Sequence, residues 1–273
     1  MSAPEHTGNA MVHDLLTDLV AERRQLISLV KDLPASSWAS NTPSPGWTIR
    51  DQIAHLAFFD EIAAMAVASP AAFAVERARA LAPGSNYDHG HLGRVPQSGA
   101  ALLEHWAVVA DRLRVSVLES PAGLRVPWYG PDMGLASMLS ARVMEHWAHG
   151  FDVAGALGAR WEPTDRLRHV AHLAVRAHAY GYVVRGRQPP QVPIRVELVS
   201  PSNEMWVFGP EGANERVVGN AEDFCLVLVR RRHVDDTALA VSGAAAREWL
   251  EIGQAYAGPP GAGPTRVGRG IAQ

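Results

Sequence analysis

The sequence predicts an α+β protein, in which an N-terminal four-helix bundle is followed by a small α/β domain. Two observations favour this class. Before residue 160, apolar side chains recur at helical spacing in four segments of about 20 residues each. After Pro189 and Pro190, short segments alternate polar and apolar residues as strands do. The length of 273 residues is sufficient for two domains with separate cores.

The bundle is expected to consist of four helices. The first is predicted over residues 11–33, where leucine and valine recur on one face. The second is predicted over about 49–68, because the Thr48–Asp51 segment resembles a capping box with Asp in place of Glu. The third and fourth are predicted over about 97–119 and 134–156. Four helices of this length are typical of a bundle.

Connecting and C-terminal segments follow other patterns. Residues 70–95 are expected to be a partly helical connection, and residues 165–186 a fifth helical segment. Asn220 is a suitable N-cap for a helix after it. The remaining expected elements are strands over 192–199, 205–208, 215–218 and 239–241, and helices over 221–231 and 244–257. The predicted domains are 1–160 and 161–258, followed by a disordered tail, 259–273, rich in Gly and Pro.

Composition excludes several classes of function. A net charge of −3 argues against a nucleic-acid or anionic-membrane partner. No apolar run is long enough for a membrane span, and the first residues lack the pattern of a signal peptide, so a cytoplasmic location is expected. Cys225 is the only cysteine, which rules out a disulfide within the chain and a Cys-rich metal site. It lies in the apolar run FCLVLV and is expected to be buried and inert.

The densest polar cluster of the chain is MEHWAHGFD, residues 144–152, within the fourth predicted helix. At about 100° per residue, His149 lies about 40° and Asp152 about 20° from Glu145, so the three share one stripe. Arg142 lies about 60° away on the same side, and His146, at about 100°, lies on the flank. Glu and His four residues apart can hold one divalent ion together.

A third ligand is expected from another helix, and His55 in the apolar part of the second helix is the best candidate. Simpler interpretations stay open. Glu145 and His149 could form a surface ion pair, and His55 could be a core histidine with a hydrogen-bond partner. His146 and His149, three residues apart, could also converge as ligands, although the helical angles favour Glu145.

Two motifs resemble a known family. GWTIRDQIAHL in the second helix, and E-x-x-x-H-x-x-D starting 90 residues after His55, resemble DinB-like metal-binding bundles. They are most similar to the mycothiol-dependent maleylpyruvate isomerases of actinobacteria. NAEDFCLVLVRRRHVDDTALAVSG and AREWLEIGQAYAGPPG resemble the sterol-carrier-like domain that ends many of those proteins. The resemblance covers nearly the whole chain and implies a divalent metal, typically zinc, held by His55, Glu145 and His149.

The resemblance also implies a function. The expected activity is an isomerase or S-transferase reaction, in which the metal activates the thiol mycothiol against a small electrophilic substrate. Two other classes stay open: a hydrolase or lyase using metal-bound water, with natural-product tailoring as one setting, and a metal- or ligand-binding protein without catalysis. The expected partners are the substrate and the thiol, and the expected state is a monomer or homodimer.

Three further residues are candidates for the site. Asp152 is expected to orient His149 as an acceptor or to be a fourth ligand, with a charge at the helix end as the simpler alternative. Arg142 is expected to bind a substrate carboxylate, or to pair with Glu145 in an empty site. Arg231 is chosen from a run of three arginines, because the family often places an arginine of its second domain near the active site.

Overall fold

The computed structural model describes residues 3–85, 91–121 and 123–267, and it confirms the α+β class. The chain divides into two compact units, residues 1–161 and 162–273. The first unit is helical, and the second combines helices with a small sheet.

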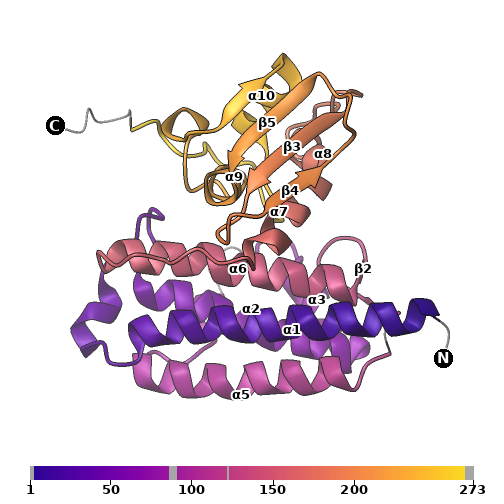
Figure 1. Ribbon diagram of the computed structural model, residues 1–273. Helices are drawn as coiled ribbons and strands as arrows, with labels where there is room; N and C mark the ends of the chain where they lie inside the picture. The colour runs from indigo at the N-terminus through magenta and orange to yellow at the C-terminus, as the bar shows by residue number, and fades with distance from the viewer. Residues whose placement is uncertain (1–2, 86–90, 122, 268–273) are drawn as a thin grey trace. The chain divides into compact units, whose positions relative to one another are not determined.

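Four long helices of the described chain build the first unit (Figure 1). They are α1 (Ala3–Val30), α2 (Ile49–Ala68), α5 (Gly99–Leu118) and α6 (Leu135–Ala156). Helix α2 packs against both α5 and α6, while α1 packs against α6 and also contacts α5. The four helices therefore surround one apolar core, in which Trp106 of α5 and Leu26 of α1 are fully buried. Gly150 lets the ring of Trp161 approach α6, because a Cβ there would lie 2.5 Å from that ring.

Helix α2 begins where the capping motif predicts. The Asp51 amide donates to Thr48 Oγ1 over 3.2 Å, and the Asp51 carboxylate accepts from the Thr48 amide over 3.0 Å. Such a cap is worth about 1 kcal/mol and satisfies amides that lack a partner within the helix. It also defines the start of the helix that carries His55.

The connections differ somewhat from expectation. Helix α1 starts well before residue 11, and it ends at Val30, shortly before Pro34. The 70–95 connection is partly helical, as predicted: it contains α3 (Pro70–Ala80) and the short helix η2 (His91–Gly93), while residues 86–90 lie outside the described residues. The smaller elements of this unit are η1 (Ala35–Ala39), β1 (Arg125–Val126) and β2 (Met133–Gly134).

The second unit contains a mixed sheet in the order β4-β3-β5-β6. Strand β3 pairs antiparallel with β4 and parallel with β5, and β5 pairs antiparallel with β6. Its elements are α7 (Leu167–Arg176), α8 (His178–Val183), β3 (Ile194–Val199), β4 (Met205–Phe208), β5 (Glu215–Asn220), α9 (Ala221–Leu228), η3 (Val234–Asp236), β6 (Ala240–Ser242) and α10 (Ala244–Ile252). One sheet face is buried through alternate residues such as Val196, Leu198 and Val217.

One predicted helical segment and two predicted helix ends in this unit were wrong. The fifth helical segment is divided at Ala177 into α7 and α8. Helix α9 ends at Leu228 rather than 231, because Arg230 has a left-handed φ of 63°. Helix α10 ends at Ile252, because Gly253 is extended. Residues 259–267 form no helix or strand, and the Val267 amide donates to Asp236; the disorder of the tail stays a prediction.

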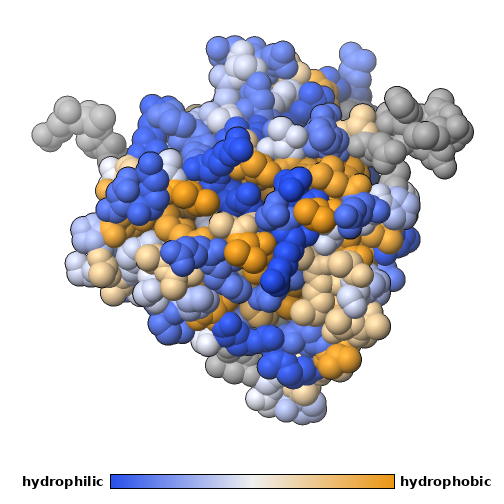
Figure 2. Space-filling view, turned by 90° about the horizontal axis from the view of Figure 1, so that it is seen from below, coloured by the Kyte–Doolittle hydropathy of each residue, from blue (hydrophilic) through white to orange (hydrophobic). Residues whose placement is uncertain are grey.

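Hydrophobic side chains are dispersed on the surface that Figure 2 shows, where they are interspersed with hydrophilic ones. Half-exposed apolar residues occur singly on several elements, as on most folded proteins. Among the helices of the described ranges, none combines the length and the hydropathy needed to cross a membrane.

Candidate metal centre

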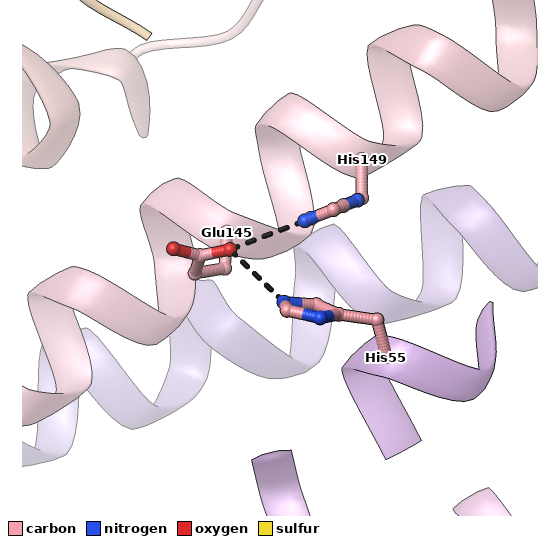
Figure 3. Close-up of side chains that lie close together, drawn as sticks. All are labelled: His55, Glu145 and His149. Atoms are coloured by element: carbon pink, nitrogen blue, oxygen red, sulfur yellow. Dashed lines mark hydrogen bonds and ion pairs between the residues drawn. The ribbon is translucent and has the colours of Figure 1, made fainter. Parts of the chain in front are cut away.

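Three side chains from two helices converge in the bundle (Figure 3). His55 comes from α2, and Glu145 and His149 come from α6. The Nε2 atoms of His149 and His55 lie 3.2 and 3.4 Å from the same carboxylate oxygen, Glu145 Oε2. One ligand atom from each residue lies within 4.8 Å of the others. The structure thus brings together the three residues that the sequence predicted as ligands.

This donor set suits a divalent cation such as zinc. Two imidazole nitrogens and one carboxylate oxygen are ordinary zinc ligands, and three protein ligands leave a fourth position for another molecule. Ligands bound at 2.0–2.1 Å with a tetrahedral angle between them are separated by roughly 3.3 Å. The observed separations of 3.2 and 3.4 Å between the histidine nitrogens and Glu145 agree with that value.

The protonation states also suit a cation. Burial lowers the pKa of His55 to about 3, assisted by repulsion from His149 and opposed by Glu145. Burial by itself raises the pKa of Glu145, but the interactions with His149 and His55 outweigh it and hold that pKa well below its usual range. His55 is therefore neutral and Glu145 ionised at neutral pH, as metal binding requires.

Each histidine also has a partner on its other nitrogen. His149 Nδ1 is hydrogen-bonded to Gln52 Oε1 on α2, and His55 Nδ1 lies 3.2 Å from His91 Nε2. Sequence reasoning missed both partners. Gln52 lies three residues before His55 on the same helix, so its spacing is a signal that could have identified it. His91 lies in a connection without periodicity, where the sequence contains no such signal.

The three side chains of the centre keep a small solvent-exposed area. The side chains of His55, Glu145 and His149 are 17%, 22% and 10% exposed. Aromatic rings border the site: the Trp47 ring centroid lies 5.4 Å from that of His55, and the Phe59 centroid lies 4.6 Å from it. The three residues are thus largely, but not completely, shielded from bulk water.

A cavity of about 410 Å³ adjoins the centre through His91, which contacts His55 and lines the cavity. The charged lining residues are Glu76, Arg79 and Arg94, and the Glu76 carboxylate accepts hydrogen bonds from both arginines. The other lining residues are Phe58, Ala80, Ala82, Pro83, Gly84, Ser85 and Tyr129. The volume is in the range of small-molecule sites.

Asp152 does not orient His149. Its side chain is 1% exposed and accepts a hydrogen bond from Ser44 Oγ over 2.8 Å. Both ring nitrogens of His149 face other residues, Gln52 and Glu145. Asp152 does lie near the end of α6, as the simpler alternative expected, but it is buried. Its position on the stripe was correct, but its carboxylate bonds Ser44 while both His149 nitrogens face Gln52 and Glu145.

Arg142 is directed into the bundle and not to the centre. It is 3% exposed, its Nε donates to Asp60 Oδ1 over 3.0 Å, and its Nη2 donates to the Leu56 carbonyl over 3.2 Å. The predicted pairing with Glu145 or with a substrate carboxylate is therefore not what the structure shows. The physical reason is that α2 presents a buried carboxylate, Asp60, within reach of the guanidinium.

His146 belongs to this second, buried cluster. Its Nδ1 lies 2.8 Å from the Arg142 carbonyl oxygen, and its Nε2 lies 3.2 Å from Asp60 Oδ2. Trp106 donates to the same Asp60 oxygen over 2.8 Å. Burial raises the pKa of Asp60, but His146 and Arg142 outweigh it, so the pKa is held below its usual range. We call Asp60, Trp106, Arg142 and His146 the Asp60 cluster.

The two neighbouring residues of α6 should respond differently to substitution. We expect Glu145→Gln to weaken metal binding, because the charge between the two histidines is lost. We expect His146→Gln to leave metal binding unchanged and to lower the free energy of unfolding by about 1–3 kcal/mol, since buried partners lose a hydrogen bond. Metal titrations and denaturant unfolding measure the two effects. The opposite ranking in the titrations would assign the ligand pair to His146 and His149.

Two residues of the second unit were singled out from the sequence, Cys225 as an inert thiol and Arg231 as a site residue. Cys225 is fully buried, and burial raises the pKa of its thiol well above the ordinary value, which agrees with an inert residue. Arg231 follows α9, and its Nη1 donates to the Val229 carbonyl over 2.9 Å. The approach of Arg231 to the metal centre stays a prediction.

Comparison with known proteins gives consistent results. Residues 19–154 match the family model described as mycothiol maleylpyruvate isomerase N-terminal domain. The chain is 45% identical over 249 residues to an uncharacterized protein of Mycobacterium tuberculosis, found in two strains, covering 91% of this chain and 97% of that protein.

Two solved structures have a similar fold. The crystal structure of the mycothiol-dependent maleylpyruvate isomerase matches with a TM-score of 0.54 and 18% identity, and that of a histidine-to-alanine variant matches with 0.52 and 17%. Each match covers 81% of this chain and 89% of the solved one. The family model matches the part that holds all three proposed ligands. The chain belongs to the mycothiol-dependent maleylpyruvate isomerase family.

Proposed function

We propose that this protein is a divalent-metal-dependent enzyme that activates a low-molecular-weight thiol, mycothiol, for isomerase or S-transferase chemistry on a small electrophile. The observation that carries the proposal is the convergence of His55, Glu145 and His149 at a partly exposed site. The family and the named activity of the solved relative support the choice of mycothiol.

The thiol has to come from solution. The only cysteine, Cys225, belongs to the second unit, is buried, and has a raised pKa. A free thiol with a pKa near 8.5 is largely protonated at neutral pH and reacts poorly. A bound divalent cation would lower that pKa by stabilising the thiolate.

The protein itself supplies the metal ligands, the surroundings of the site and the place for the electrophile. Glu145 contributes the single negative charge that offsets a cation, and His55 and His149 each contribute an imidazole nitrogen. The rings of Trp47 and Phe59 limit water around the site, which favours attack by the thiolate over hydrolysis. The adjoining cavity is the proposed place for the electrophile, with Phe58 offering an apolar wall and Arg94 a positive charge.

Cobalt substitution tests the thiol requirement. We expect addition of mycothiol to the cobalt-loaded protein to produce an intense near-ultraviolet charge-transfer band, because thiolate sulfur would bind the ion directly. The band should also appear in Cys225→Ala, whose buried thiol takes no part. In His149→Ala, which lacks one ligand, it should be absent.

Turnover separates the competing functions. A rate that requires added thiol supports the proposal. If thiols give no band and no change in rate, while a substrate is still converted, the thiol function is wrong and water is the better nucleophile. If metal and ligands bind tightly but no electrophile is converted, the protein is a binding protein.

A further inference from the structure

We propose that His91 is a positioning residue of the metal centre, which accepts the Nδ1 proton of His55 and thereby fixes the orientation and tautomer of that ligand. This inference rests on the proposed metal-dependent function. It concerns a residue outside the ligand set, in the connection between α3 and α5.

The geometry of the three residues supports this role. His55 directs Nε2 to Glu145, at 3.4 Å, and Nδ1 to His91 Nε2, at 3.2 Å. If Nε2 is the ligand atom, its lone pair is used and the ring proton must reside on Nδ1. That proton then needs an acceptor, which metal-bound histidines almost always have. His91 can accept it only through an unprotonated Nε2, so His91 must be neutral and carry its own proton on Nδ1.

The other histidine ligand has a matching arrangement. His149 directs Nε2 to Glu145 and Nδ1 to Gln52 Oε1. Gln52 is itself held in place, because its amide nitrogen donates to Thr42 Oγ1 over 2.9 Å. In both proposed ligands, Nε2 therefore faces the shared Glu145 carboxylate and Nδ1 faces a polar atom of another side chain, which is the arrangement found around metal-bound histidines.

His91 is held firmly enough to act in this way. The residue is 6% exposed, and its ring packs against Phe58 and Phe59, with centroids 5.2 and 5.4 Å away. Arg50 of α2 fixes the surrounding connection, since its Nη2 donates to the carbonyl oxygen of Leu92 over 3.0 Å and to that of Pro96 over 3.2 Å. The connection that carries His91 is thus attached to the helix that carries His55.

Two substitutions of His91 separate the acceptor atom from the ring. His91→Phe keeps a ring against the two phenylalanines but removes the acceptor, and His91→Gln restores an acceptor like that of Gln52. We expect the Phe variant to bind zinc or cobalt on the order of 10-fold to 100-fold more weakly. The Gln variant should bind nearly as tightly as the unaltered protein and restore its cobalt absorption spectrum. His105→Phe, a ring exchange on α5 away from the ligands, is the matched control and should change neither.

The tautomers of the two histidines can be measured directly in the unaltered protein. Imidazole ¹⁵N shifts of the zinc-loaded protein should show His55 and His91 both protonated on Nδ1. A His91 ring protonated on Nε2 would overturn the proposal. So would unchanged metal affinity in His91→Phe, or equal weakening in His91→Phe and His91→Gln, because the ring alone would then matter. Failure of the unaltered protein to bind metal is a different result, since it removes the proposed function as well.

Discussion

The unaltered protein is expected to bind about one divalent ion per chain, and His149→Ala is expected to lose it. His149 is one of the three proposed ligands, so two would remain, which is too few for a tight site. The affinity should fall by more than the roughly 100-fold that loss of an outer partner can cost. Elemental analysis after dialysis against a weak chelator measures the content.

A matched substitution makes that result specific. His105→Ala removes a histidine of α5 whose Nε2 lies 3.8 Å from Glu61, outside the ligand set. It should retain the full metal content. Equal metal content in His149→Ala and the unaltered protein would show that the metal does not bind at this site, whatever the family resemblance implies.

Asp60→Ala is expected to be strongly destabilising, by about 3–5 kcal/mol, because it leaves the buried guanidinium of Arg142 without its counter-charge. His146 and Trp106 lose a partner at the same time. Denaturant unfolding of the metal-free protein measures the loss. Asp111→Ala is the control: Asp111 is 63% exposed and pairs with Arg114, so its removal should cost at most about 1 kcal/mol.

The effect should also depend on pH in a defined direction. The pKa of Asp60 is lower in the folded protein than in the unfolded chain, where it is about 3.9. Its stabilisation is therefore fully present above that value and is lost as the pH falls through the lower folded pKa. The difference in unfolding free energy between the unaltered protein and Asp60→Asn should be constant near neutral pH and shrink in acid. A difference that grows in acid, or equal losses in Asp60→Ala and Asp111→Ala, would contradict a buried ionised Asp60.

Local signals predicted much of the fold. The apolar periodicity of α2, α5 and α6 and the capping box at Thr48 depend on residues close in sequence, so their positions followed directly. Helix ends were less predictable. The left-handed Arg230 that ends α9 is not signalled by a glycine, and the break at Ala177 falls on a residue type that is itself a good helix former.

The sequence by itself determined which side chains of α6 share a face. Helical geometry alone places Glu145 and His149 on one stripe and His146 on its flank. The pairing with His55 came from the resemblance and from an apolar helix face. Only the tertiary structure decided what surrounds the ligands. Asp60 draws Arg142 and His146 inward because α2 packs against α6, and His91 reaches His55 because a connection without periodicity folds back on α2. Such contacts join residues distant in the chain, and their free energy depends on burial that exists only after the helices have packed.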